Sequence, residues 1–577
     1  TSSSDAPITH LLTKTIDVLI IGSGISGLFT ALKLSEYNIR SLIVTKNALS
    51  ENNSRYAQGG IAAVLPENDD DSLSLHVQDT LNVGAGLCVP EAVQAILSQG
   101  HLAISDLLLM GVPFDKDELG NIEKTLEAGH SVRRIIHAGG DATGKQVEMT
   151  LINKVHADPN IEVIEYCEVA HLFTQDKACD GAHAINYQTQ QEYRIFSQHT
   201  ILATGGLGRL YSQSTNPAGA TGNGFSLAYQ AGAELRDMEF VQFHPTAFFK
   251  DGNAHFLISE ALRGEGGVLK NHAGERFAKH YDTRGELAPR DVVTRAIYQE
   301  IEKQKQLNPD ADHVYLDISH LTPSKIEHRF PTILKACEQF GIDIRKDQIP
   351  VAPAAHYVMG GVVVDMNGQT SLQRLHVVGE TVWTGLHGGN RLASNSLLEC
   401  VVLARNCAQA IGTTASPTGL KNTLTEQTEF LMPYKQAPIQ FDPPETLTQA
   451  TQTLHQLMWK QVGIVRNETA LRDALEKIQQ LDAEAQNADY KQYAPLGIDY
   501  VNQLTLARLI TQAALSRTES RGAHFRKDFP QEHATAQHST QHYTTSNPTD
   551  INEIQEDCLS HDTYSNANAF PYAGTRR

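Results

Sequence analysis

A glycine-rich turn at Gly22, Gly24 and Gly27 is the part of the sequence whose spacing indicates a chemistry most directly. It follows the continuous apolar run of residues 16–21 and precedes a segment with apolar residues at helical spacing. Glycines in this setting, with Ser23 between them, let a pyrophosphate approach the N-terminus of a helix. The sequence therefore predicts a dinucleotide-binding site, and an ordinary glycine-rich turn is the alternative.

The end of the next predicted strand distinguishes between dinucleotides. This strand covers residues 41–45 and ends at Thr45-Lys46. NAD-binding units favour Asp or Glu about 20 residues after the glycines, because a carboxylate there accepts the ribose hydroxyls. Lys46 departs from that pattern, which favours a flavin over a nicotinamide cofactor.

Length and composition limit the remaining possibilities. The chain has 577 residues, of which 41% are hydrophobic and 20% charged, which is typical of a mixed α/β enzyme with two or three domains. Its net charge of -19 predicts no nucleic-acid or membrane partner, and it would also repel an anionic substrate. A site for a dianion must therefore assemble its own Arg and His residues.

The cysteines and the apolar segments bear on compartment and metals. Seven cysteines are scattered without a C-x-x-C pair, so we expect neither a disulfide framework nor a metal site. No run reaches the ~18 apolar residues of a membrane helix, and the first residues lack a secretory pattern. We expect a cytoplasmic enzyme.

Several segments share the residue patterns of one flavoprotein family. They are Ser54-Arg-Tyr-Ala-Gln58-Gly59-Gly60, Ala203-Thr204-Gly205-Gly206, Ala220-Thr-Gly-Asn223-Gly224, Gln242-Phe-His244-Pro-Thr246, Ser259-Glu-Ala-Leu-Arg-Gly-Glu265, Gly379-Glu380 and Arg391-Leu-Ala-Ser-Asn-Ser396-Leu397-Leu398. Together they closely resemble the superfamily of succinate dehydrogenases, fumarate reductases and L-aspartate oxidases. The resemblance runs through essentially residues 16–526.

This resemblance implies an α/β fold with a Rossmann-like FAD-binding domain, an inserted α+β capping domain and a C-terminal helical bundle. Apolar strands at residues 199–203 and 375–378 each end in glycine, as the first strand does, which predicts one sheet built from distant segments. We expect an N-terminal extension at 1–15, the FAD-binding domain at 16–240 and 351–412, the capping domain at 241–350, a linker at 413–445, the helical domain at 446–526 and a disordered tail at 527–577.

Two positions indicate the aspartate oxidase branch. Respiratory members carry a His, covalently linked to FAD, where this chain has Asn53, so the resemblance implies noncovalent FAD. Where the dehydrogenases read F-G-G-Q-S, this chain reads Glu127-Ala-Gly-His-Ser131. The extra carboxylate of Glu127 can pair with a substrate ammonium, which aspartate has and succinate lacks. Without the resemblance, Glu127 would be interpreted as a solvated or structural carboxylate.

The family pattern also assigns the substrate and cofactor residues. It places His244, Arg290, His356 and Arg391 around the substrate carboxylates, together with Ser259. Arg290 matches the residue that donates a proton when relatives reduce fumarate, and a purely electrostatic role is the alternative. The residues expected to bind FAD are Gly22, Ser23, Gly24, Gly27, Lys46, Ser54, Gln58, Gly59, Gly60, Ala203, Thr204, Gly205, Asn223, Glu380, Ser396 and Leu397.

The activity implied by the resemblance is oxidation of L-aspartate to iminosuccinate, with dioxygen or fumarate reoxidising the flavin and quinolinate synthase as a transient partner. A fumarate reductase or succinate dehydrogenase flavoprotein subunit is the first alternative. A flavin-bearing binding protein that hands its product to a partner is the second. At position 223 the family commonly has Asp, and Asn223 is not expected to abolish FAD binding.

Overall fold

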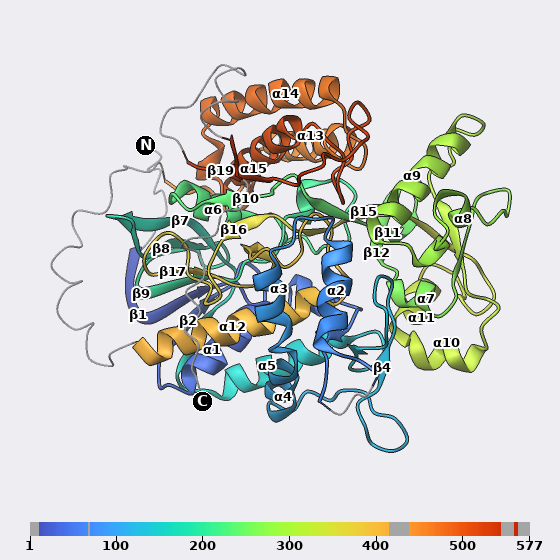
Figure 1. Ribbon diagram of the computed structural model, residues 1–577. Helices are drawn as coiled ribbons and strands as arrows, with labels where there is room; N and C mark the ends of the chain where they lie inside the picture. Colours follow the sequence, from blue (N-terminus) through green and yellow to red (C-terminus); the bar gives the residue numbers. More distant parts are fainter. Residues whose placement is uncertain (1–10, 67–69, 415–437, 544–558, 563–577) are drawn as a thin grey trace.

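The computed structural model describes residues 11–66, 70–414, 438–543 and the backbone of 559–562 (Figure 1). A seven-stranded sheet forms its centre, in the order β6-β2-β1-β9-β8-β7 with β17 paired to β9. Its strands are β1 (Leu11–Ile21), β2 (Ser41–Val44), β6 (Ile161–Ile164), β7 (Cys167–Gln175), β8 (Ala178–Asn186), β9 (Gln191–Leu202) and β17 (Leu375–Val377). The predicted assembly of one sheet from distant segments is confirmed, because β1 pairs in parallel with β2 and β9, and β17 with β9.

Both faces of this sheet are covered, which is why β1 reads as an apolar run. Val18 and Ile20 belong to one apolar cluster and Leu19 to another, as the alternation of a strand requires. On the first face lie α1 (Ile25–Ser35), α5 (Thr143–Ala157) and α12 (Asn395–Thr414), seen together below the sheet in Figure 1. The expectation that residues 11–15 belong to an extension is wrong, since they pair with β9 as part of β1.

A layer of short elements covers the FAD-binding domain near α12. It contains α2 (Leu73–Val83), α3 (Pro90–Leu97) and α4 (Gly100–Leu109), and the small sheet β3 (Ile61–Ala62), β5 (Ile135–Ile136) and β4 (Lys124–Thr125). Among the described residues, the span Pro90–Leu109 alone is long and apolar enough to cross a membrane. Val93, Ile104 and Leu107 of this span are buried in the core, so its apolar character is used in packing.

The capping domain lies to one side in Figure 1 and has its own apolar core. Its sheet has the order β12 (Asn253–Leu257), β11 (Val241–Lys250), β15 (Ile349–Val358), β14 (Val314–Asp317), β13 (Val268–Lys270). Its helices are α7 (Glu260–Gly264), α8 (Ala278–Tyr281), α9 (Arg290–Lys305), α10 (Pro323–Arg329) and α11 (Pro331–Glu338). Since β15 continues to Val358, it carries the chain back into the FAD-binding domain.

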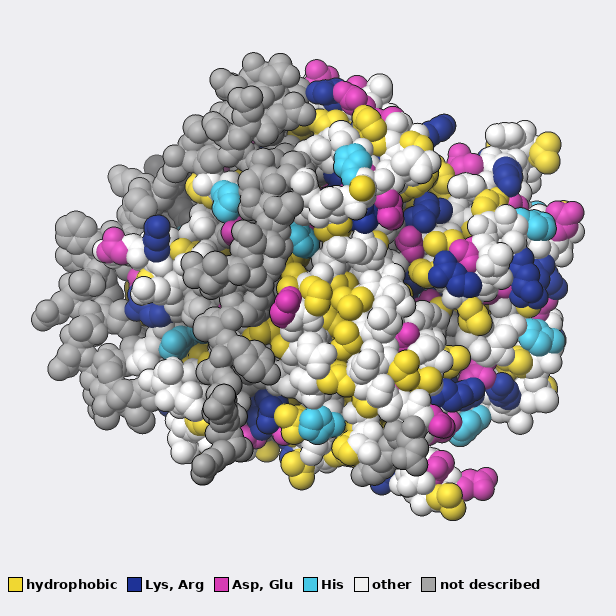
Figure 2. Space-filling model, in the orientation of Figure 1, with side chains coloured by type: hydrophobic (Ala, Val, Ile, Leu, Met, Phe, Trp, Pro, Cys, Tyr) yellow, Lys and Arg dark blue, Asp and Glu magenta, His cyan; other side chains and the backbone are white. Residues whose placement is uncertain are grey.

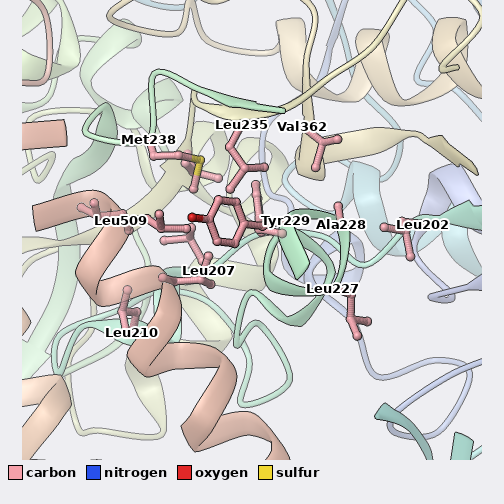
Figure 3. Close-up of a cluster of buried hydrophobic side chains, with 14 of the residues drawn as sticks. Leu202, Leu207, Leu210, Leu227, Ala228, Tyr229, Leu235, Met238, Val362 and Leu509 are labelled. Atoms are coloured by element: carbon pink, nitrogen blue, oxygen red, sulfur yellow. The ribbon is translucent and has the colours of Figure 1, made fainter. Parts of the chain in front are cut away.

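The helical domain consists of α13 (Glu445–Gln461), α14 (Glu468–Asn487) and α15 (Leu496–Ser516). It packs on the remaining face of the central sheet through α6 (Asn223–Gln230). Figure 3 shows Leu509 of α15 in one buried cluster with Tyr229 of α6 and Leu235. Most of the expected linker, residues 415–437, lies outside the described residues.

The expectation of a disordered tail is wrong for residues 527–543. Residues His538–Gln541 form β19 in a second sheet, ordered β18 (Val382–Trp383), β16 (Gly361–Val363), β10 (Leu235–Arg236), β19, β20 (Leu559–Asp562). Asp237 accepts hydrogen bonds from Ser539 N at 3.0 Å and contacts His538 Nδ1 at 2.6 Å, while Ser539 Oγ donates to Glu239 at 2.6 Å. Buried carboxylates fix this polar strand, so a composition poor in apolar residues gave no sign of it.

Replacing His538 tests whether this strand is part of the folded core. In His538→Ala the buried Asp237 loses a partner, so the thermal midpoint should fall, at a cost of about 1–3 kcal/mol. The matched variant His542→Ala changes an exposed histidine just beyond the strand and should leave the midpoint unchanged. Equal midpoints in both variants would mean that β19 contributes nothing to stability.

Candidate active site

A cavity lies between the FAD-binding and capping domains. In the FAD-binding domain, the cavity is lined by the turn after β1, the segment 51–60 and the ends of β2 and β9. In the capping domain, it is lined by residues of β11, α7, α9 and β15. All the residues expected to bind FAD or substrate line it except Gly27. The expected residues are thus brought together from the whole length of the FAD-binding and capping domains.

The glycine turn is shaped for close approach of a ligand. Gly22 has φ +113°, and a Cβ there would lie 2.1 Å from the carbonyl oxygen of Ala203. A Cβ on Gly27 would lie 2.2 Å from the Gly22 carbonyl oxygen, so Gly27 allows α1 to pack on the turn and does not itself face the cavity. Gly24 caps α1 without a side-chain hydrogen bond, and Ile25 N donates to Ser54 Oγ at 3.1 Å, so the next N–H groups of the first turn are the ones available to a pyrophosphate.

The flavin end of the cavity has polar groups that suit FAD. Gln58 Oε1 is buried without a hydrogen-bond partner among the described residues, and is an acceptor available to a ligand. Glu380 accepts hydrogen bonds from Val358 N at 3.2 Å and Asn53 Nδ2 at 3.3 Å, and burial raises its pKa to about 7. With the glycine turn, these groups fit the ring system and pyrophosphate of FAD.

Two arginines supply the positive charge that a dianion needs. Arg290 Nη1 and Arg391 Nε both donate to Gln242 Oε1, at 3.0 and 3.2 Å. Burial, followed by repulsion from Arg290, lowers the pKa of Arg391 to about 10, so Arg391 remains protonated at neutral pH. Its guanidinium lies 4.1 Å from the ring centroid of Tyr357, and its Nη2 has no partner among the described residues. The pair can therefore bind carboxylate.

The two histidines are positioned by the strands that join the domains. His244 lies on β11, and His356 lies at a bulge of β15, since the register shifts between Gln242 and Phe243. Their ring centroids are 5.1 Å apart. His356 Nδ1 contacts Thr215 Oγ1 at 3.0 Å.

His244 has a defined tautomer. Its Nδ1 accepts a hydrogen bond from Thr246 N at 3.2 Å, so in the neutral ring Nε2 carries the proton. Burial, with repulsion from Arg290, lowers the pKa of His244 well below its ordinary value, and the ring is neutral at neutral pH. Nε2 is buried without a partner among the described residues and can donate to a substrate carboxylate.

Glu127 adds a carboxylate to this cationic site. It is 2% exposed, and its Oε2 accepts a hydrogen bond of 2.6 Å from Ser394 Oγ. Burial, with repulsion from Glu260, raises its pKa. Ser394 has φ +63°, a conformation that costs a non-glycine residue of order 1–3 kcal/mol and is retained where it positions a functional group. Sequence reasoning missed Ser394, although it lies within the Arg391–Leu398 motif.

Sequence reasoning also missed Glu260. Its two oxygens bind Arg290 Nε and Arg263 Nη2, each at 2.8 Å. Ser259, which was expected to bind substrate, caps α7 by accepting a hydrogen bond from Ala261 N at 3.2 Å, and lines the cavity. Glu260 follows Ser259 directly in its motif, and that adjacency was the available signal.

One part of the cavity brings cationic and donor groups together, although carboxylates also line the cavity. Figure 2 shows Lys and Arg interspersed with Asp and Glu over the capping domain, whereas inside the cavity Arg290, Arg391 and the donor His244 face one small space. A Rossmann-like fold whose cavity is lined by the residues expected to bind FAD, with an anion site beside them, defines a flavin-dependent oxidoreductase that acts on a small carboxylate.

Comparison with known proteins agrees with this class. The family model described as FAD binding domain matches residues 17–397, and that described as Fumarate reductase flavoprotein C-term matches residues 451–561. The structure is similar to the FrdA chain of E. coli quinol fumarate reductase, with TM-score 0.86 and 28% identity over 97% of this chain and 98% of that one. It is also similar to Sdh1 of Mycobacterium smegmatis, with TM-score 0.77 and 30% identity over 96% and 94%.

Proteins with similar sequences identify the family within this class of flavin-dependent oxidoreductases. L-aspartate oxidase 1 of Ralstonia nicotianae is 44% identical over 89% of this chain and 96% of its own. L-aspartate oxidase of Neisseria meningitidis is 44% identical over 89% and 99%. The chain belongs to the L-aspartate oxidase family.

Replacing Gln242 tests whether the shared amide holds the two arginines. Gln242→Met keeps the length but removes the acceptor between Arg290 and Arg391, so their repulsion should displace them. The dissociation constant of succinate, measured by perturbation of the flavin spectrum, should rise about tenfold. Gln99→Met, the same exchange outside the cavity, should have no effect, and an unchanged constant in Gln242→Met would contradict this role.

Proposed function

We propose that this chain is an FAD-dependent enzyme that oxidises L-aspartate to iminosuccinate, the first step of NAD biosynthesis through quinolinate. The observation that carries this function is Glu127, a buried carboxylate beside Arg290 and Arg391. A site for succinate or fumarate needs cations only. A site that adds a buried carboxylate suits a dicarboxylate that also bears an ammonium.

The carboxylates of the substrate are held by groups already oriented in the structure. Arg391 offers its free Nη2 and His244 its Nε2–H, while His356 faces the same space. Arg290 is fixed by Glu260 and Gln242, so its remaining N–H groups are held in a constant position for a ligand. We assign catalytic roles to Arg290, His244 and His356, and binding roles to Ser259 and Arg391.

The amino group is oriented by Glu127. Ser394 holds one oxygen of this carboxylate at 2.6 Å, which leaves the other to accept from the substrate ammonium. FAD, when bound, would accept the hydride lost from the substrate Cα–H bond, while the nitrogen loses a proton as the C=N bond forms. The buried site keeps water away while the imine forms.

We further propose that FAD is held noncovalently, because Asn53 occupies the position of the covalent histidine and its amide is bonded to Glu380. Fumarate, the same dicarboxylate without the amine, fits the same arginines as electron acceptor, and dioxygen is the other acceptor proposed. The described cysteines are free, which suits the cytoplasm. The imine product hydrolyses readily in water. We therefore propose a transient contact with quinolinate synthase, which can be tested by trapping the free imine with semicarbazide.

Anaerobic reduction of the bound flavin is the direct test. L-aspartate should bleach the visible absorption of the flavin, and succinate at the same concentration should not, because succinate offers Glu127 no ammonium. Bleaching by succinate alone would place the chain with the dehydrogenases. Acid precipitation of the same preparation should release all the flavin into the supernatant.

The variant Glu127→Gln separates recognition of the ammonium from recognition of the carboxylates. The Michaelis constant for aspartate should rise about tenfold or more, since a charge-assisted contact is lost. The dissociation constant of succinate should stay the same or fall, because a buried negative charge is removed from a dianion site. Glu123→Gln, four residues earlier, is the matched control. If Glu127→Gln weakened the binding of aspartate and of succinate to the same extent, the assignment of Glu127 to the substrate ammonium would be contradicted.

The pH profile gives a second readout of Glu127. Its pKa is raised by burial and by Glu260, and only the ionised form pairs with an ammonium. Therefore kcat/KM for aspartate should rise as the pH increases through this raised pKa. In Glu127→Gln that ascending limb should disappear, and its persistence would assign the titration to another group.

A further inference from the structure

A polar cluster joins the helical domain to the far end of the FAD cavity. Lys46, just after β2, contacts Glu168 Oε2 at 3.0 Å and donates to Thr221 Oγ1 at 2.8 Å. It also pairs with Asp499 of α15. Lys46, Glu168, Thr221 and Asn223 line the cavity, and Asp499 contacts Lys46, Thr221 and Asn223 from the helical domain.

This cluster lies where a dinucleotide fold places the ribose of its adenosine. In such folds the pyrophosphate sits at the first helix and the ribose hydroxyls reach an acid at the end of the second strand. Lys46 has three donors and no acceptor, so it cannot take that role. Glu168 is the cavity-lining carboxylate beside it, 4% exposed, and burial raises its pKa to about 7. A ribose diol would add hydroxyl donors to those of Lys46 and Asn223, which already contact this carboxylate.

The cluster also explains why Asn stands at position 223. Asn223 Nδ2 donates to Glu168 Oε1 at 2.5 Å and to Asp499 Oδ1 at 2.7 Å. An aspartate there would place a third carboxylate within hydrogen-bond distance of these two, with Lys46 as the cation. The amide instead bridges the carboxylates without adding charge.

We propose that Glu168 accepts the ribose hydroxyls of the FAD adenosine, and that Asp499 of the helical domain is a positioning residue that holds Lys46 and Asn223 for it. Packing of the helical domain and affinity for FAD are then linked. The apolar contacts of α15, including Leu506 and Leu509, fix where Asp499 stands. The proposal rests on FAD as the cofactor and does not depend on which substrate is oxidised.

The variant Asp499→Asn tests this link in the full chain after its flavin has been removed. The dissociation constant of FAD, measured by quenching of flavin fluorescence, should rise about tenfold. The thermal midpoint of the flavin-free protein should stay unchanged, while the stabilisation gained on adding FAD should shrink. Asp473→Asn, an exposed exchange on α14, is the control. A lower midpoint of the flavin-free protein with unaltered FAD affinity would reduce Asp499 to a structural contact and overturn the proposal.

Exchanging the charges of residues 223 and 499 tests whether repulsion between carboxylates weakens FAD binding. Asn223→Asp should weaken FAD binding by repulsion, and the double variant Asn223→Asp with Asp499→Asn should recover it, because the number of carboxylates is restored. Glu168→Gln should weaken FAD binding in every background. If Asn223→Asp alone binds FAD as well as the parent chain, the proposal is wrong. A protein that passes these tests but is not bleached by aspartate would refute the proposed function and leave this inference standing.

Discussion

The active site depends on keeping Arg290 and Arg391 charged and close together inside the protein. Burial, followed by repulsion from Arg290, lowers the pKa of Arg391, because like charges repel strongly where water is excluded. Gln242 shares one oxygen between them, and Glu260 balances Arg290. Arg391 Nη2, which has no partner among the described residues, remains available to a carboxylate even though the chain as a whole is acidic.

The groups around these arginines come from separate domains, and the strands β11 and β15 set their geometry. His244 lies on the first strand and His356 at a bulge of the second, so the pairing of two strands fixes the distance between the histidines. Glu127 and Ser394 reach the same space from the FAD-binding domain. The cavity that these residues line thus lies between the capping domain and the FAD-binding domain.

Much of the fold and site could be predicted because the motifs are local. The glycine turn, the strands that end in glycine and the spacing of apolar residues in the C-terminal helices each depend on a few neighbouring residues. Other features depend on partners distant in sequence. Residues 11–15 extend β1 beyond the core and are ordered by pairing with β9, and β19 is ordered by Asp237 and Glu239, which lie about 300 residues earlier.

The sequence by itself determined the cofactor class, the family and most of the residues that line the cavity, since these follow from residue types at fixed short spacings. The tertiary structure alone decided which of them act together. It assigned Gly27 to packing, and brought Ser394 onto Glu127 and Asp499 onto Lys46. Such contacts join residues separated by hundreds of positions, and no local pattern encodes them because they form only when the domains pack.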